Sequence, residues 1–352
     1  MRRRIGLTSL GRISGAWARL SLTAVLSGGC SGAAPSALSL PVAPWAGYAY
    51  LELAQERGFD RAEGLTITID HHEDPQLIVQ HCLHGRHTIA PLTSVELVDI
   101  CSRRPQRCPV VVLVLDESHG ADKLLVHRSI PTLQGLRGRR VGLAPTSLGP
   151  FVLGRALASV GSDISEVTIV PTQPEAMAAA LHNGQVEAVA SFPPFSELVE
   201  RLGIARALFD SRSMPGEIVD VLVVDPQFLA ANGEVVVKLL RSWQRAHAWA
   251  RRNPAEARTI LARHLKLSES AVARVEEGLA YFPLAQQLEM LRPGGPISEN
   301  LRAVQGVQQQ LGIVRADAPL PQVSDALVRE ALWRGPGNQA GLPSAPIAVA
   351  PK

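Results

Sequence analysis

The sequence predicts an α/β protein with two lobes and further helices towards its C-terminus, and three observations lead to this fold class. Short runs rich in β-branched residues alternate with helical runs, a pattern typical of parallel βαβ units. The alternation restarts near residue 123, and a purely helical section is expected over residues 226–333. A chain of 352 residues is long enough for two lobes that each bury a core.

The first block of alternating elements builds the first lobe. Its expected strands are 38–43, 65–70, 88–92 and 110–115, and its expected helices are 48–57, 75–84 and 94–102. Apolar positions recur at helical spacing in 235–253, within the later helical section. We therefore assign residues 38–122 and 226–333 to the first lobe.

The second block builds the second lobe, residues 123–225. Its expected strands are 123–128, 136–144, 167–171, 186–192 and 218–225, and its expected helices are 147–160, 174–183 and 195–202. Two crossings, near 120–130 and 218–226, would join the lobes. Ligands of such sheets bind outside the carboxyl ends of the strands, so a cleft is expected between the lobes.

The first 29 residues are predicted to be a signal peptide. They carry five arginines and no acid, and the apolar run "LSLTAVL" is followed by "LSGGC". This ending resembles a bacterial lipobox, in which Cys30 would be lipidated and would anchor the protein to a membrane. Leu26 stands one place earlier than usual and Arg19 interrupts the apolar run, so a plain secretory signal or an ordinary helix stays an alternative.

Charge and composition exclude some partners. Without the leader, 30 bases face 32 acids, so the formal charge falls from +3 to −2 and no basic patch argues for nucleic acid. No other run approaches the roughly 20 apolar residues of a membrane helix. Residues 334–352 are rich in glycine and proline and are predicted to be disordered.

The remaining cysteines fit an oxidising compartment. Cys101 and Cys108 flank a short loop, "CSRRPQRC", a spacing that suits a disulfide, and Cys82 would then be a buried thiol. Three unpaired cysteines would be expected instead if the protein stayed in the cytosol.

Five segments in a fixed order resemble one family. They are "PWAGYAYLELAQERGFDRAEGLTITI", "DESHGADKLLV", "LRGRRVGLAPTS", "GQVEAVASFPPF" and "PGEIVDVLVVD", within residues 38–310. Together they look like the periplasmic solute-binding proteins of the nitrate, sulfonate, taurine and thiamine-pyrimidine uptake systems. Two positions depart from the family's pattern, His87 in "GRHTIA", where an acid is frequent, and Pro194 in "SFPPF", where a charge is frequent.

The resemblance implies a type II-like, two-lobed binding protein that hands a small solute to the permease of an ABC transporter. The solute would be sulfonate-like, nitrate-like or pyrimidine-like. The resemblance also implies a monomer in the periplasm or cell envelope that uses no cofactor and is not an enzyme.

Several side chains are expected to contact the ligand. The rings of Trp45 and Tyr48 follow the first strand and can wall a cleft, whereas Tyr50 is expected to anchor its helix in the core. The second lobe would add Ser191 and Phe192 from "SFPPF".

Hydroxyl groups stand at two expected helix starts, Thr93–Ser94 and Thr146–Ser147. Each can cap its helix, which is the simpler interpretation. The same positions also leave free N–H groups and a positive dipole end facing the cleft, and such a helix start can bind an anionic group.

Residues near the crossings complete the expected set. Ser118 and His119 would reach the cleft, while Asp122 would brace the hinge. Asp220 lies in the apolar run "IVDVLVV", where an unpaired carboxylate is costly. It either binds a cationic or N–H-bearing group of the ligand or pairs across the hinge.

Five of the ten histidines lie between residues 71 and 87, namely His71, His72, His81, His84 and His87. The 81/84 pair shares a helical face, so a surface metal-binding lipoprotein is an alternative function. A solvated face explains the cluster more simply, and no metal is expected.

An enzyme is the other alternative, because a pyrimidine-synthesising enzyme that uses a pyridoxal lysine shares this fold by resemblance. Lys123 is the only lysine of this sequence that could plausibly take the role of the pyridoxal lysine. The chain also has no G-x-S-x-G, H-E-x-x-H or phosphate-loop motif, so no other catalytic motif supports an enzyme.

Overall fold

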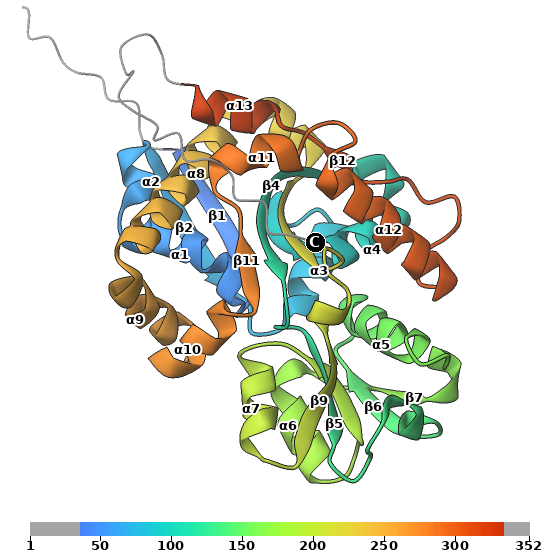
Figure 1. The fold of residues 1–352 in the computed structure, drawn as a ribbon. Coiled ribbons are helices and arrows are strands. Elements are labelled where there is room, and N and C mark those ends of the chain that lie inside the picture. The colour runs from blue at the N-terminus through green and yellow to red at the C-terminus, as the bar shows by residue number, and fades with distance from the viewer. Residues whose placement is uncertain (1–35, 334–352) are drawn as a thin grey trace, which may run out of the picture. The chain divides into compact units, whose positions relative to one another are not determined.

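The computed structural model describes residues 36–333, so the expected signal peptide, Cys30 and the expected C-terminal tail lie outside the described residues. The elements form two lobes (Figure 1): the first contains a two-stranded and a five-stranded sheet and is built from both ends of the described chain, and the second contains one five-stranded sheet from its middle. Among the described residues, no helix combines the length and apolar character needed to cross a membrane.

The first lobe contains seven strands. They are β1 (Ser36–Val42), β2 (Leu65–His71), β3 (Ile89–Thr93), β4 (Val110–Ser118), β10 (Val219–Val224), β11 (Leu279–Tyr281) and β12 (Gln322–Val323). β1 and β2 pair in parallel, whereas the order β11–β4–β10–β3 is antiparallel, with β12 parallel to β4. The predicted parallel arrangement is therefore wrong for most of this lobe, since β10 returns from the second block to lie between β3 and β4.

Ten helices surround these strands. They are α1 (Ala49–Glu56), α2 (Phe59–Ala62), α3 (Pro75–Leu83), α4 (Ser94–Arg103), α8 (Pro226–Arg252), α9 (Pro254–His264), α10 (Glu269–Glu276), α11 (Leu284–Met290), α12 (Pro296–Gln310) and α13 (Ala326–Leu332). The section after residue 226 is helical as predicted, except that β11 pairs with β4 and β12 extends the same sheet.

The second lobe has one five-stranded sheet. Its strands are β5 (Lys123–His127), β6 (Arg140–Leu143), β7 (Thr168–Pro171), β8 (Ala188–Ser191) and β9 (Ala205–Asp210), and its helices are α5 (Leu148–Ala158), α6 (Met177–His182) and α7 (Phe195–Arg201). The order is β7–β6–β8–β5–β9, in which β6 pairs in parallel with β7 and β8, and β5 runs antiparallel to β8 and β9.

Two crossings, residues 119–122 and 211–218, join the lobes. β10 belongs to the first lobe, so the second crossing comes earlier than predicted. Ser118 Oγ lies 2.8 Å from Ser211 Oγ, and the N–H of Gly120 donates to the same Ser211 oxygen over 2.6 Å. Gly120 has a φ of 110°, a value that only glycine adopts readily, so this residue lets the chain leave β4 for the second lobe.

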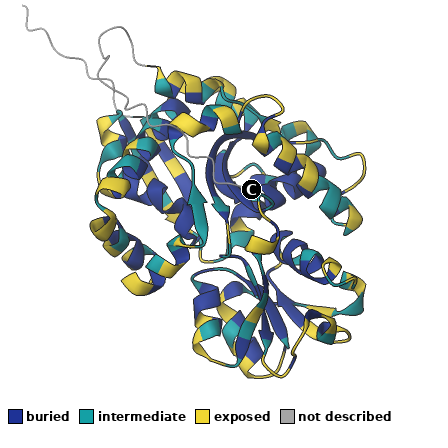
Figure 2. Ribbon diagram, in the orientation of Figure 1, coloured by how far each residue is buried: buried dark blue, intermediate teal, exposed yellow. Residues whose placement is uncertain are grey.

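Burial follows the sheets, as Figure 2 shows by the dark blue strands and the yellow outer faces of the helices. Trp243 of α8 is fully buried, and Tyr50 of α1 packs edge-on against it with ring centroids 6.4 Å apart. Cys101 and Cys108 form a disulfide at the end of α4, and Cys82 is a buried free thiol. Tyr50 thus lies in the core, the position expected for a helix anchor.

Candidate ligand cavity between the lobes

A cavity of about 50 Å³ opens where the two lobes meet. The first lobe contributes Ala43, Trp45, Tyr48, Pro75, Thr93, Glu96 and Asp220, and the second lobe and its crossing contribute Asp122, Ala144, Thr146, Leu148, Gly149, Val152, Ala190, Ser191 and Phe192. Several of these residues stand at the carboxyl ends of β1, β3, β6 and β8, or just beyond them. Such ends form the usual ligand site of α/β sheets.

Trp45 and Tyr48 reach the cavity because β1 passes directly into a short 3-10 helix, Ala46–Tyr48. The indole N–H of Trp45 donates to Asp116 over 3.2 Å, and the Tyr48 hydroxyl donates to Asp220 over 2.6 Å. The ring of Trp45 also meets Phe192 of the second lobe edge-on, with centroids 5.9 Å apart. Both rings line the cavity, and both also hold a buried carboxyl group in place.

Four buried carboxyl groups lie in or next to the cavity. Asp116 on β4 and Asp220 on β10 stand directly opposite each other in the antiparallel pair. Glu96 and Asp122 are also buried, and together with Asp220 they line the cavity. Like charges opposite each other in a sheet destabilise it, so this arrangement has a cost for folding.

Burial raises the pKa of all four groups. The pKa rises to about 8 for Asp116, to about 7 for Glu96 and to about 6 for Asp122, in each case mainly because the charged form loses its hydration. Burial and then the charge of Asp116 place the pKa of Asp220 well above its ordinary value. Carboxyl groups of this cluster are therefore still protonated at neutral pH. A positively charged ligand group would displace these protons.

We expect these pKa shifts to make the solute-free protein less stable as the pH rises from 6.5 to 8. The folded state holds more protons than the unfolded state in this window, so the free energy of unfolding falls, by about 1.4 kcal/mol per pH unit for each excess proton. His87 and His247, whose pKa values burial lowers to about 4, act in the opposite direction, but this effect fades above their ordinary value of 6.5 as the unfolded state also loses its imidazole protons.

Urea unfolding at several pH values between 6.5 and 8 measures this slope. Glu52 does not line the cavity, but burial raises its pKa to about 7, so it also contributes to the fall of the unfolding free energy with pH. Asp116→Asn should flatten the slope, and a wild-type stability that stays level or rises across the window would contradict the expectation.

The cavity lining contains no lysine, arginine or histidine, although it contains three carboxyl groups. Ser191 adds a second polar feature, because its hydroxyl oxygen is buried and has no hydrogen-bond partner within the described residues. Buried polar groups are normally paired, so this hydroxyl is available to a ligand.

The start of α4 differs from the expected anion site. The Thr93 side chain accepts from the N–H of Glu96, and Glu96 accepts from the Thr93 N–H and hydroxyl, which forms a capping box. A carboxyl group of the protein thus already occupies this helix start. At the start of α5, Ser147 makes no side-chain cap, and its hydroxyl donates instead to the carbonyl of Val95 in the first lobe over 3.3 Å.

The structure brings together Trp45, Tyr48, Thr93, Thr146, Ser191, Phe192 and Asp220 from the predicted set. Four predicted residues do not line the cavity. Ser94 and Ser147 are buried beside it, Ser118 is bonded within the crossings, and His119 is exposed there. The hydroxyls of Ser118 and Ser147 bond Ser211 and the carbonyl of Val95, and Thr93 rather than Ser94 caps α4.

Sequence reasoning missed Glu96 and Asp116, and it placed Asp122 only at the hinge. The backbone of Asp122 does brace the hinge, accepting from the Ser211 N–H over 3.0 Å, but the residue also lines the cavity. The spacing T-x-x-E of a capping box was a signal for Glu96.

The lobes also touch outside the cavity. Arg274 of α10 forms an ion pair with Glu197 of α7, with 2.8 Å between Nη2 and Oε2. On the other side of Trp45 lies a second cavity of about 200 Å³, whose lining mixes Glu52, His71, Arg201 and Lys266.

The lysine needed for the enzyme alternative does not line the cavity. Lys123 forms an ion pair with Glu200 over 2.8 Å and is not among the lining residues, although its neighbour Asp122 is. Cys82 lies in the core beside α4, and burial raises the pKa of its thiol to about 12, so the reactive thiolate is scarce.

Known proteins resemble this chain along much of its length. It is 27% identical to the taurine-binding periplasmic protein of Escherichia coli over 251 residues, which cover 68% of this chain and 76% of that protein. The chain spans about half (48%) of a putative binding protein of Brucella abortus, to which it is 20% identical over 157 residues.

Solved structures share the two-lobed fold. The alkanesulfonate-binding protein SsuA from Xanthomonas axonopodis pv. citri, bound to MOPS, gives a TM-score of 0.66 at 18% identity and covers 86% of this chain and 99% of its own. The desulfurization enzyme DSZB also has this fold, with a TM-score of 0.62 at 19% identity, covering 84% of this chain and 99% of its own. The model of the family described as "NMT1/THI5 like" matches residues 45–257, more than half of the sequence, and the chain therefore belongs to this family.

Proposed function

We propose that the protein is the solute-binding component of an ABC importer, which captures a small solute between its lobes and delivers it to the permease. Family membership and the periplasmic binding proteins among its relatives support this function. The observation that carries it is the cavity at the junction of the lobes, lined from both sides by strand ends, rings and buried polar groups.

We place the protein in the periplasm, because the leader sequence and the periplasmic relatives agree. The lipid anchor on Cys30 is part of the proposal, and it rests on "LSGGC" alone. The mature protein would then work at the membrane surface beside its permease.

The lining favours a solute with a positively charged or N–H-rich group. Three carboxyl groups line the cavity and a fourth, on Asp116, lies behind Trp45, with no basic side chain to balance them. An ammonium or protonated heterocycle would displace the protons of these groups and pair with the carboxylates, whereas an anion would find no positively charged side chain in a poorly hydrated site. Trp45 and Phe192 would then cover the apolar or flat part of the solute.

A solute that also carries an anionic group would place it at the start of α5. Thr146 lines the cavity there, and the helix start has no side-chain cap. Zwitterions such as taurine therefore remain compatible with the lining, whereas simple anions such as nitrate are not.

A binding function fits the cavity better than catalysis does. Lys123 and Cys82, which would supply a Schiff base or a thiolate, are not among the lining residues, and Lys123 is paired with Glu200. The acids of the lining are held by Tyr48 and by the capping box, so they are placed to bind a solute.

A thermal-shift screen tests the proposal with five probes, namely benzylamine, cytosine, taurine, benzenesulfonate and nitrate. We expect benzylamine or cytosine to raise the melting temperature, with taurine weaker and the two anions without effect. Stabilisation should approach ~2.7 kcal/mol at a hundredfold excess over the dissociation constant. The affinity for a cationic probe should rise between pH 6 and 8, as the carboxyl groups of the lining release their protons.

Two outcomes would count against the proposal in different ways. Stabilisation by the anions alone, with an affinity that falls as the pH rises, would mean that protonated carboxyl groups donate to an anion, and the solute class would be wrong. If no probe binds and X-ray scattering shows the same radius of gyration with every probe, the binding function itself would lose its support.

A further inference from the structure

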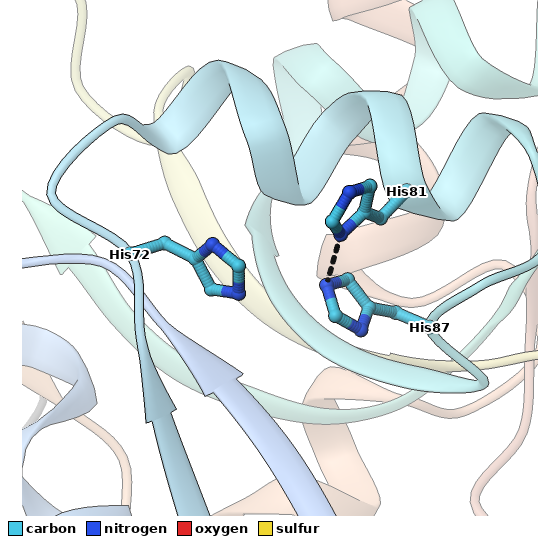
Figure 3. A group of neighbouring side chains, drawn as sticks. All are labelled: His72, His81 and His87. Atoms are coloured by element: carbon cyan, nitrogen blue, oxygen red, sulfur yellow. Dashed lines mark hydrogen bonds between the residues drawn. The ribbon is translucent and has the colours of Figure 1, made fainter.

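Three histidine rings meet on the first lobe, outside the cavity described above. His72 follows the last residue of β2, His81 lies on α3, and His87 lies in the turn between α3 and β3. Figure 3 shows the three rings facing one another beneath α3, each from a different segment. All three are half-buried, so they do not form the solvated face that the sequence favoured.

The nitrogen atoms of these rings are close enough to share one ion. One ring nitrogen from each histidine lies within 4.8 Å of the other two, and His81 Nδ1 lies 2.9 Å from His87 Nε2. The ligand nitrogens of a tetrahedral zinc ion are about 3.3 Å apart, because each Zn–N bond is about 2.0–2.1 Å. Small rotations of the three rings would therefore close the site.

A carboxylate stands behind one of the rings. Asp70 Oδ2 lies 3.0 Å from His72 Nε2, and this contact fixes the orientation of the imidazole. Carboxylates that accept from the ring nitrogen not bound to the metal orient the histidine ligands of many metal sites, so an ion would bind His72 through Nδ1. His84, which the sequence paired with His81, turns away, since its Nδ1 bonds the carbonyl of Gln80 on its own helix over 2.7 Å.

A second group of possible ligands, Glu52, His71 and His264, lies on the neighbouring surface. The Glu52 carboxylate, itself one of the three possible ligands, already contacts both imidazoles, with its oxygens 3.3 Å from His264 Nδ1 and from His71 Nδ1. His81 and His87 instead face each other nitrogen to nitrogen, where a single proton can bridge them and a metal ion can replace it. The geometry therefore favours His72, His81 and His87 over the second group.

We propose that His72, His81 and His87 bind one divalent transition-metal ion of the zinc type, with water in the remaining coordination position. Imidazole ligands suit zinc, copper and nickel, and an open fourth position is common in sites with three protein ligands. The ion would fasten α3 to the end of β2 and to the turn before β3.

Zinc titration of the full chain, prepared without a histidine tag and stripped with a chelator, tests this site. We expect one zinc ion per chain and a rise in melting temperature on adding zinc. His81→Ala and His87→Ala should each lower the zinc affinity by at least about 100-fold, and Asp70→Asn by about 10- to 100-fold, as for groups that orient a ligand.

His84→Ala is the matched control, because it removes an exposed histidine from the same turn of chain and should leave the zinc affinity unchanged. Cobalt(II) gives a second readout on the wild-type protein that needs no variant. Visible absorption bands of a tetrahedral site are expected, without the near-ultraviolet band that a cysteine thiolate would add.

Three results would overturn the proposal. One is the absence of saturable zinc binding. Another is an equal loss of affinity in His84→Ala, which would indicate diffuse surface binding. The third is a loss of binding in His264→Ala but not in His81→Ala, which would assign the ion to the second group.

Discussion

Asp220→Asn is expected to make the protein more stable and to weaken its binding of the solute. The change removes one of two buried carboxyl groups that face each other across β10 and β4, and the asparagine oxygen can still accept from the Tyr48 hydroxyl. Burial and the charge of Asp116 raise the pKa of Asp220, so at pH 8 the folded state loses about 1.4 kcal/mol for each unit by which that pKa is raised, and the asparagine removes this cost. At pH 8 the unfolding free energy should rise, while affinity for a cationic solute falls at least about 100-fold, or ~2.7 kcal/mol.

Urea unfolding at pH 8 and calorimetric titration with benzylamine or cytosine measure the two effects on the same preparation. Asp99→Asn is the matched control. Asp99 is also a buried acid and lies on α4, as Glu96 does, but it pairs with Arg103 and does not line the cavity. The control should keep full affinity. A variant Asp220→Asn that binds normally would show that this carboxyl group only shapes the sheet.

Tyr50→Ala is expected to lower the unfolding free energy by about 3–5 kcal/mol, the range for removing a large buried ring. The ring lies against His247, Trp243 and Tyr281, with centroids 5.1, 6.4 and 4.9 Å away. It does not line the cavity, so the folded fraction should bind solute with unchanged affinity. Denaturant unfolding measures the loss.

Tyr50→Phe separates the ring from its hydroxyl and should cost far less than the alanine variant. A loss below 1 kcal/mol in Tyr50→Ala would contradict the core role of that residue.

Trp45→Ala is expected to weaken both folding and binding. The ring is buried and its N–H donates to Asp116, and the same ring lines the cavity.

The sequence predicted most elements because each carries a local signal. Periodicity located the helices that became α1, α4 and α8 and the strands that became β4 and β5. It could not show that β10 inserts between β3 and β4, or that β11 joins β4, since pairing between distant segments leaves no mark in the spacing of apolar residues. For the same reason the sequence placed the second crossing too late, near 218–226, because it could not show that β10 belongs to the first lobe.

The same limit applies to the site. Trp45 and Tyr48 could be predicted because a ring just after a strand reaches the end of the sheet, whatever the register. The contact of Asp116 with Asp220 depends on the register of two strands more than 100 residues apart. No local sequence pattern at Asp116 or at Asp220 predicts that the two residues pair. The acid-lined cavity therefore follows only from the structure.

The place of β10 also bears on the order in which the protein can fold. The strands of the second lobe all lie within residues 123–210, so this sheet can close from one continuous stretch of chain. The first sheet has to wait for residues 219–224, which must find β3 and β4 across a long loop. We expect the second lobe to form early in folding and the first lobe to form late. Until then β3 and β4 expose unpaired edges, and this is the interval in which the chain would depend most on chaperones.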